Sequence, residues 1–277
     1  MQARKFQQWK RATCEFIPAL WCQYMLGIVP AAGSATRMQP LSGSKELLPL
    51  GRHDGAGEAA GAIRVVSDYL VERMLLAGAD RLCFIISGDK GDLVRYYARS
   101  RWGGRIFFAL QPQPSGLCDA VFRAAPLVRA REAVLIGLPD TVWYPRDAFA
   151  QRLRAGVHLI TFPVARPEEF DAVEEAPTGV VRRIEVKTPG SPTRRVWGAI
   201  TAPGEVFLRL ERFWRACDGQ AQFLGDLFNA WIASGELVTC DRQGSRYWDI
   251  GTPAGYEQAL RDRVWTGYVE PGIAVSG

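Results

Sequence analysis

Short apolar runs alternate with helix-like segments along the first part of the chain. Apolar runs that end at glycine or at polar residues predict buried strands at 26–31, 81–87, 105–110, 133–138 and 158–164. Between them, apolar residues recur at helical spacing at 65–78, 92–99 and 117–128. Strands separated by helices are typical of βαβ units. The pattern therefore predicts an α/β fold with a mostly parallel, Rossmann-like mixed sheet flanked by helices.

The pattern changes after the fifth of these strands. Further strand-like segments lie at 179–187, 196–202, 236–241 and 246–250. Further helix-like segments lie at 203–215, 222–234 and 252–263. The last helix has Thr252 as its expected N-cap and Pro253 in its first turn. These segments predict additional strands of a mixed sheet and helices that pack against it.

The chain divides into one main domain and two flanking segments. We expect the domain to cover residues 25–265, after a loosely ordered extension at 1–24 and before a tail at 266–277. The extension is basic and is followed by apolar residues, as in a secretory signal peptide. We nevertheless favour an extension, because the cleavage site would fall in a loop that suits ligand binding. No other apolar run reaches the roughly 20 residues of a membrane helix, so we expect no membrane partner.

Charge and composition narrow the choice of ligand. The formal net charge is +5, and residues 1–24 supply +3 of it, which leaves +2 for the rest. No basic run interleaved with aromatic residues occurs there, so no nucleic-acid partner is expected. Only five of the 34 basic residues are lysines: Lys5, Lys10, Lys45, Lys90 and Lys187. A lysine in a loop is therefore notable, because its compact charge suits a phosphate group.

Cysteine and histidine usage excludes several kinds of site. The chain has six cysteines without a C-x-x-C pair, which favours free thiols and a cytoplasmic location. It has only two histidines, which makes a multi-histidine metal site or a histidine-based triad improbable.

The loop after the first predicted strand carries the clearest ligand-binding pattern. It reads A-A-G-S-A-T-R-M-Q-P from Ala31 to Pro40, and Lys45 follows shortly after it. Small residues let backbone N–H groups approach an anion, and Arg37 and Lys45 add positive charge. The loop lacks both G-K-[ST] and G-x-G-x-x-G, so it is neither a Walker loop nor a dinucleotide fingerprint. From these residues alone, an ordinary turn remains an alternative.

Two aspartates and one glutamine are further candidates. Asp140 follows the strand at 133–138, so we expect it at the carboxyl edge of the sheet, where ligands bind. Asp249 lies between Trp248 and Ile250, where an unpaired charge is costly. Two carboxylates together with phosphates form a normal Mg²⁺ site, although each could instead cap a turn or a helix. Gln111 could read a base edge with its amide or lie in an exposed loop.

Four stretches resemble one enzyme family, in the order in which that family has them. They are P-A-A-G-S-A-T-R-M-Q-P-x₄-K-E-L-L-P-L at 30–50, Q-P-Q-P-S-G-L at 111–117, L-I-G-L-P-D at 135–140 and Y-W-D-I-G-T-P at 247–253. The chain resembles the sugar-1-phosphate nucleotidylyltransferases, especially the glucose-1-phosphate thymidylyl- and uridylyltransferases. The resemblance implies the nucleotide-diphospho-sugar transferase type of fold and makes 25–265 a nucleotidyltransferase domain.

The resemblance also implies roles for individual residues. It gives catalytic roles to Arg37, Lys45 and Asp140, and Mg²⁺ binding to Asp140 and Asp249. The nucleotide, dTTP or UTP, would contact Ala32, Gly33, Thr36, Gln111 and Gly116. The sugar 1-phosphate would contact Lys187, in R-I-E-V-K-T-P, and Gly198. Members of the family are often homo-oligomers.

The chain departs from the family at four places. Ala35 replaces a glycine, Ser44 replaces a proline and Val186 replaces the glutamate that reads sugar hydroxyls. Pro139-Asp140-Thr141 replaces the usual G-D. These departures leave the identity of the sugar open, whereas the type of reaction still follows from the resemblance.

The expected reaction is transfer of a nucleotidyl group from an NTP to a sugar 1-phosphate, with release of pyrophosphate and no covalent intermediate. A cytidylyltransferase that acts on another phosphate substrate and a non-catalytic nucleotide- or sugar-binding homologue are the alternatives. A Rossmann oxidoreductase is disfavoured because the glycine fingerprint is missing. No hexapeptide repeat follows the last motif, which argues against an attached acetyltransferase domain.

Overall fold

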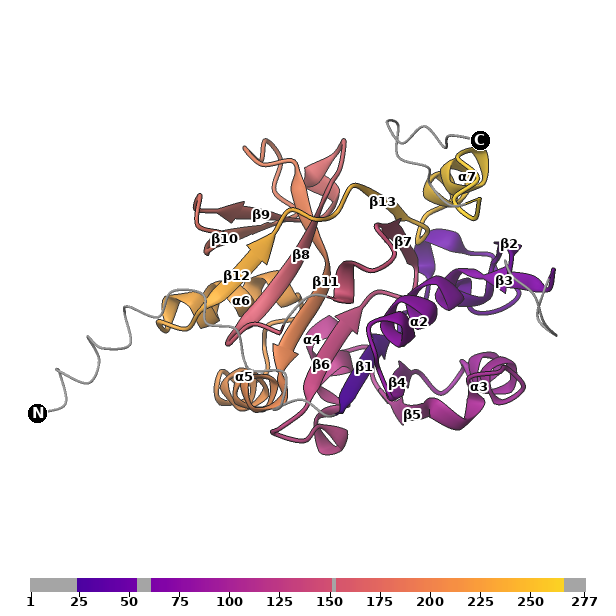
Figure 1. The fold of residues 1–277 in the computed structure, drawn as a ribbon, viewed down its shortest axis with the longest axis horizontal. Coiled ribbons are helices and arrows are strands. Elements are labelled where there is room, and N and C mark those ends of the chain that lie inside the picture. The colour runs from indigo at the N-terminus through magenta and orange to yellow at the C-terminus, as the bar shows by residue number, and fades with distance from the viewer. Residues whose placement is uncertain (1–23, 54–60, 151–152, 267–277) are drawn as a thin grey trace, which may run out of the picture.

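The computed structural model describes residues 24–53, 61–150 and 153–266, in which a nine-stranded mixed sheet forms the centre (Figure 1). The predicted extension 1–24, except Tyr24, and most of the tail 266–277 lie outside these residues. The strands of this sheet are β1 (Met25–Pro30), β4 (Arg81–Ile86), β5 (Ile106–Leu110), β6 (Ala133–Gly137), β8 (Val157–Pro163), β9 (Asp171–Glu175), β10 (Val181–Val186), β11 (Arg195–Pro203) and β12 (Val238–Asp241).

The sheet has a parallel half and a mixed half. Strands β5, β4, β1 and β6 lie side by side and run parallel. Strand β11 then pairs antiparallel with β6, β8 and β9, while β9 pairs antiparallel with β10 and β8 pairs parallel with β12. The predicted α/β fold with a mixed sheet is confirmed. In the parallel half, the ends of β1 and β6 meet at one carboxyl edge.

Helices cover both faces of the sheet. They are α2 (Val66–Leu76), α3 (Gly91–Ala98), α4 (Gly116–Phe122), α5 (Gly204–Ala216), α6 (Leu224–Ala233) and α7 (Pro253–Arg261). Side chains of α4, α5 and α6 share one core cluster with Leu26 and Ile28 of β1. Side chains of α2 and α3 share another with Val29 of the same strand. The alternation of side chains along β1 thus serves both layers.

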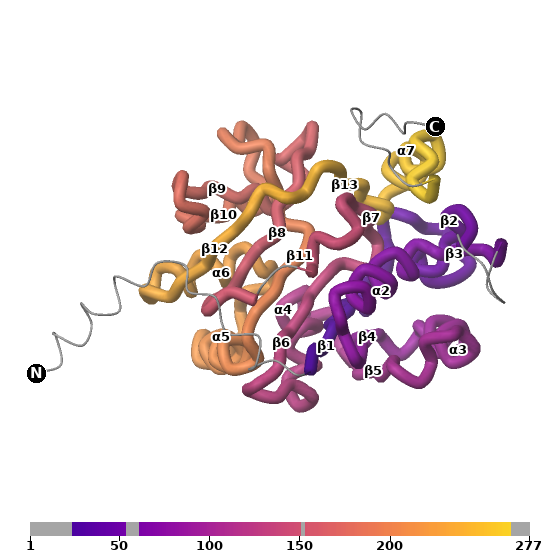
Figure 2. Tube along the Cα trace, viewed as in Figure 1, coloured from indigo at the N-terminus to yellow at the C-terminus, as the bar shows by residue number. Residues whose placement is uncertain are grey.

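Two small sheets lie beside the main one. Strand β2 (Pro49–Arg52) pairs with β3 (Ile63–Val65), and β7 (Thr141–Tyr144) pairs with β13 (Arg246–Asp249). Figures 1 and 2, drawn from the same side, show β13 beside its partner β7, with α7 next to them. Leu50, Val142 and Trp248 join these strands in a third core cluster. Consequently, segments from both ends of the described chain pack together.

Short 3-10 helices complete the described fold. They are η2 (Thr36–Met38), η3 (Lys45–Leu47), η4 (Gly103–Arg105), η5 (Ala125–Leu127), η6 (Ala148–Ala150) and η7 (Pro167–Glu169). The helix predicted at 117–128 ends at Phe122, because Pro126 lacks the N–H that would bond to the Phe122 carbonyl and its ring would clash with that carbonyl. The predicted N-cap of α7 is confirmed, since Thr252 Oγ1 accepts a hydrogen bond from Gly255 N.

In the described residues, no helix is both long and apolar enough to cross a membrane. The described cysteines are free: Cys83, Cys118, Cys217 and Cys240.

Candidate functional site

The loop between β1 and β2 presents the predicted phosphate-binding residues. Ala32 is buried at the end of β1, whereas Gly33 is exposed and has open space beside its Cα. Thr36 and Arg37 follow in η2, and both are exposed. The loop therefore offers backbone and a guanidinium to solvent at the carboxyl edge of the parallel strands.

Ala35, the off-pattern residue of this loop, has left-handed backbone angles. Its φ is 54° and its ψ is 34°, a region that glycine adopts without steric penalty and alanine adopts at a cost of about 1 kcal/mol. This conformation gives a physical reason for the glycine that the family usually has here. Ala35 adopts this conformation despite its methyl group.

Lys45 and Asp140 form an ion pair at this edge. Lys45 lies in η3, and its Nζ donates to Asp140 Oδ2 at 2.5 Å. Asp140 lies between β6 and β7, so no helix follows it and it does not serve as a helix cap. Burial alone would lower the pKa of Lys45, but Coulombic attraction and the hydrogen bond to Asp140 outweigh burial and raise it. Lys45 is thus held as a cation against a carboxylate.

Asp249 lies beside Asp140 because β13 pairs with β7. Asp249 is opposite Thr141 in the register, and Ile250 N donates to the Asp140 carbonyl oxygen at 2.8 Å. A methyl group added at Gly251 would lie 2.8 Å from Asp140 Oδ2 and 2.9 Å from Asp249 Oδ1. The two carboxylates therefore converge on one point. Burial, followed by repulsion from Asp140, raises the pKa of Asp249.

Arg37 approaches the same point from the loop. Its Nη2 would lie 3.2 Å from the methyl group added at Gly251, and its Nη1 lies 3.9 Å from Asp249 Oδ2. The structure thus brings together Arg37, Lys45, Asp140 and Asp249, as the sequence predicted.

The donor set can be tested for its fit to Mg²⁺. Within the described ranges, no group of three or more His, Cys, Asp or Glu side chains could hold a metal ion. Two converging carboxylates nevertheless fit Mg²⁺, which in nucleotide sites takes one or two carboxylates together with phosphate oxygens and water. Asp140 and Asp249 are the residues that would hold it.

Gln111 and Gly116 lie together, but their contacts point inward. Gln111 is buried, and its Nε2 donates to the Gly116 carbonyl at 3.0 Å and to Asp119 Oδ2 at 2.8 Å. Gly116 has a φ of +93°, and a methyl group there would lie 2.8 Å from Cβ of Gln222. Close packing of the 222 segment therefore accounts for the glycine. The Gln111 amide is held in a fixed orientation by its contacts with α4.

The two residues predicted to bind the sugar phosphate lie in the mixed half. Lys187 is exposed, and its Nζ lies 4.4 Å from the ring centroid of Phe223. Gly198 lies under Tyr247, whose ring carbon would be 2.6 Å from an added methyl group. Close packing against the Tyr247 ring explains why this position is a glycine. In the structure, Gly198 therefore supports the ring of Tyr247.

Asp171 is a carboxylate that the sequence reasoning missed. It lies opposite Val186 in the β9–β10 register, beside the position of the family glutamate. Its Oδ2 accepts a hydrogen bond from Trp197 Nε1 at 3.2 Å. Burial raises the pKa of Asp171 above its ordinary value. The hydrogen bond from Trp197 and attraction to Lys187 offset only part of this rise. A neighbouring strand thus supplies a carboxylate near Lys187, although Val186 itself does not.

Tyr247 connects the two halves of the site. It packs against Phe162 and Phe170, with ring centroids 5.5 Å and 5.8 Å away. Burial and the negative charges of Asp249, Asp140 and Asp171 raise its pKa. A pocket of about 600 Å³ lies along this side and is lined in part by Phe170, Tyr247 and Asp249. Asp249 thus borders this pocket, whereas Asp140, Asp171 and Lys187 are not among the residues that line it.

A second group of residues that the sequence reasoning missed fixes the segment around Lys45. Ser44 donates from both its N–H and its Oγ to the carboxylate of Asp92, each at 2.7 Å. Lys90 binds both carboxylate oxygens of Glu46 at 2.8 Å. Ser44, which replaces a proline, thus gains two contacts that proline could not make as donor.

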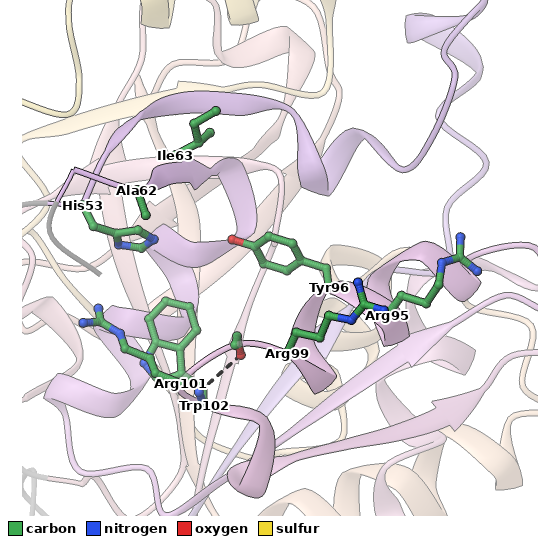
Figure 3. Close-up of a pocket in the computed structure, with 9 residues that line it drawn as sticks. His53, Ala62, Ile63, Arg95, Tyr96, Arg99, Arg101 and Trp102 are labelled. Carbon is green, nitrogen blue, oxygen red and sulfur yellow. Dashed lines mark hydrogen bonds between the residues drawn. The ribbon is translucent and has the colours of Figure 1, made fainter. Parts of the chain in front are cut away.

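Another pocket lies away from these residues, beside α3 (Figure 3). Its volume is about 490 Å³, and its lining includes His53, Tyr96 and Trp102, with the Arg101 guanidinium carbon 4.8 Å from the Trp102 ring. None of the residues predicted from sequence lines it.

Comparison with known proteins places these motifs in a family. The nucleotidyl transferase family matches residues 26–264. The glucose-1-phosphate thymidylyltransferase of Neisseria meningitidis is 29% identical over 160 residues, which cover 54% of this chain and 51% of that enzyme. The enzyme of the same name from Actinoplanes sp. is 26% identical over 247 residues, 85% of this chain and 77% of that enzyme. The match to the Neisseria enzyme thus spans about half of its length.

Solved structures share the fold. A Bacillus anthracis protein provisionally assigned as a glucose-1-phosphate thymidylyltransferase superposes with a TM-score of 0.73 at 18% identity, covering 89% of this chain and 98% of that one. The UTP-bound UGPase of Acinetobacter baumannii gives 0.67 at 18% identity, covering 87% and 93%. Since the family match extends over nearly the whole described chain, the protein belongs to the nucleotidyl transferase family.

Proposed function

We propose that the protein transfers a nucleotidyl group from an NTP to a sugar 1-phosphate. One observation carries the proposal: Asp140 and Asp249 converge on a single point, and Lys45 and Arg37 flank it at the mouth of the small-residue loop. Two carboxylates and two cations around a phosphate loop suit phosphoryl chemistry, which depends on positioning and charge more than on covalent catalysis.

The reaction requires no enzyme nucleophile. A phosphate oxygen of the sugar 1-phosphate attacks the α-phosphorus of the NTP, the bond from that phosphorus to the β-phosphate oxygen breaks, and pyrophosphate leaves with the electron pair. Lys45 and Arg37 neutralise the negative charge that develops toward the leaving pyrophosphate. Mg²⁺ held by Asp140 and Asp249 would supply further charge neutralisation to the phosphates.

The substrates follow from the two ends of the site. On the nucleotide side, the family resemblance gives Gln111 the role of reading the base, and dTTP or UTP is our expected nucleotide. On the other side, Lys187 would hold the phosphate of the sugar, with the Asp171 carboxylate nearby. Relatives named as glucose-1-phosphate thymidylyltransferases support glucose 1-phosphate as the first substrate to test.

The decisive experiment is a matrix of the four common NTPs and dTTP against several sugar 1-phosphates with Mg²⁺, read by pyrophosphate release. We expect turnover with dTTP or UTP and none after chelation with EDTA. Turnover only with CTP and a non-sugar phosphate would establish the cytidylyltransferase alternative. NTP binding without turnover on any substrate would establish a non-catalytic homologue.

Substitution tests the assignment of the aspartates. Asp140→Asn keeps the shape of the side chain and removes its charge, so we expect a loss of at least about 10²-fold in kcat, the scale on which electrostatic transition-state stabilisation acts. Asp218→Asn, on the exposed turn after α5, serves as the control. Near-normal turnover by Asp140→Asn would show that the metal assignment is wrong.

A further inference from the structure

Lys90 is the one lysine of the described residues that the proposed chemistry does not use. Lys45 and Lys187 have assigned roles, and Lys5 and Lys10 lie outside the described residues. Lys90 is only 5% exposed, at the start of α3, and its Nζ holds both carboxylate oxygens of Glu46 at 2.8 Å. Glu46 is 1% exposed.

Such a pair is a poor way to gain stability. Removing two charges from water costs several kcal/mol per ion, and well-packed apolar residues are often as good or better at the same place. A buried pair therefore calls for another reason, and its position supplies one. Glu46 directly follows Lys45, so its carboxylate lies next in sequence to the cation of the proposed site.

Contacts at Ser44 and at Glu46 fix the segment on both sides of Lys45. Ser44 binds Asp92 through its N–H and hydroxyl. The Ser67 hydroxyl donates to the Glu46 carbonyl at 2.9 Å. Lys90 holds the Glu46 side chain. The segment that carries Lys45 is thus anchored from α2 and from α3, and its ammonium group alone extends toward Asp140.

Glu46 also competes for Lys45. The negative charges that attract Lys45 include Asp140, Glu46 and Asp249. Without a partner of its own, the Glu46 carboxylate would be a buried, unpaired charge next to a lysine, and pairing with that lysine would lower its free energy. Lys45 would then turn away from Asp140.

We propose that Lys90 is a positioning residue: it occupies both oxygens of Glu46 and thereby leaves Lys45 directed at Asp140 and at the phosphates of the substrate. This inference rests on the proposed function for the part that concerns phosphates. The part that concerns the orientation of Lys45 rests on the Lys45–Asp140 and Lys90–Glu46 contacts and on the sequence neighbourhood of Lys45 and Glu46, and does not depend on the substrate.

The test uses a charge-removing variant and its compensated form. Lys90→Met keeps the length of the side chain and removes the cation, so Lys45 should be drawn to Glu46. A misplacement of about 1 Å at a reacting group costs on the order of 10²-fold in rate, and we expect a fall in kcat of that size with little change in KM for the sugar 1-phosphate. Lys90→Met/Glu46→Gln removes the competitor as well and should recover most of kcat.

A fall in kcat measured well below the melting temperature of Lys90→Met separates positioning from a structural role, because Glu46→Gln would also relieve the instability of an unpaired Glu46 charge. Arg99→Met, an exposed cation of the same region, is the matched control and should have wild-type kinetics. Melting temperatures of all variants report folding. Wild-type kcat in Lys90→Met, or a double variant as slow as the single one, would overturn the inference.

A crystal structure of Lys90→Met provides a readout that does not depend on activity. We expect Lys45 Nζ within hydrogen-bond distance of Glu46 and away from Asp140. If Lys45 stays on Asp140, the inference fails even if the enzyme is active. If Lys45 moves but the wild-type protein turns over no NTP and sugar phosphate, the inference holds and the proposed function fails.

Discussion

Asp171 offers a carboxylate beside the position at which the family glutamate is missing. The family glutamate before the lysine is Val186 here, and Asp171 lies opposite it on the neighbouring strand. Its carboxylate accepts from Trp197 Nε1 and from the Gly225 backbone, which keeps it in place. The carboxylate near Lys187 thus belongs to β9, whereas the family glutamate would belong to β10. We expect this change of strand to alter which sugar 1-phosphate is preferred.

We predict that Asp171→Asn lowers kcat/KM for the preferred sugar 1-phosphate by roughly 10-fold or more, because a hydrogen bond to a charged group contributes about 1.5–3 kcal/mol. The amide oxygen can still accept from Trp197 and Gly225, so the melting temperature should change little. The measurement is kcat/KM over a panel of sugar 1-phosphates. An unchanged ranking and unchanged values would show that Asp171 does not contact the sugar.

At the level of single residues, the sequence predicted the centre of the site better than its surroundings. Arg37, Lys45, Asp140 and Asp249 meet as expected, because each belongs to a short motif that ends a strand or starts a turn. The role of Lys90 depends on contacts between segments far apart in sequence, and no local pattern contains that information. The scarcity of lysine was the one available signal.

The short segment from Ser44 to Leu47 depends on α3 for its position. Ser44 binds Asp92 twice, and Leu93 N also donates to the Asp92 carboxylate at 2.9 Å. Burial alone would raise the pKa of Asp92, but these hydrogen bonds outweigh burial and lower it. A loop that lacks the usual proline is therefore fixed from outside by a charged hydrogen-bond acceptor.

We predict a pH-dependent loss of this contact. Because the pKa of Asp92 is lower in the folded state than in the unfolded state, its contribution is fully present above the unfolded value of about 4 and is lost as the pH falls through the folded value. Asp92→Asn should melt below wild type at pH 7, and the difference should shrink as the pH falls toward about 3. A difference that stays constant over this range would contradict the prediction.

Elements with a strong local pattern were predicted well, and weak ones were not. The helix at 65–78 and the strand at 81–87 match α2 and β4 closely, because apolar residues recur at helical spacing in the first and run continuously through the second, which is buried on both faces. Strand β9 was missed, since D-A-V-E-E is rich in acidic residues that rarely favour strands. It forms because β10 and β11 pair with it, which is a tertiary effect.

The molecule as a whole joins both ends of its described chain through the third core cluster. Tyr256 donates to the Pro49 carbonyl at 2.7 Å, and Tyr144 donates to the Val264 carbonyl at 2.7 Å. Gly51 of β2 has a φ of +85°, and a methyl group there would lie 2.4 Å from Cβ of Trp265. The segment that carries Lys45 therefore continues into β2, and β2 packs against the last described residues of the chain.

We predict that Gly51→Ala destabilises the protein by about 2–4 kcal/mol, since a strained backbone and a steric clash add together. Gly78→Ala is the matched control: its φ is +100°, but nothing lies within 4 Å of the added methyl group, so it should lose only about 1 kcal/mol. Urea unfolding measures both. Equal losses would show that Trp265 does not pack as described.

The pairing of β7 with β13 has a consequence for when the protein becomes competent during synthesis. A nascent chain displays its phosphate loop and Asp140 early, but Asp249 leaves the ribosome much later, and its partner is Thr141. Until the two strands close this long loop, the cation site has only one of its carboxylates. At the proposed site, a magnesium–nucleotide ligand would therefore stabilise the fully synthesised, folded chain, and it would hardly stabilise a nascent chain that still lacks Asp249.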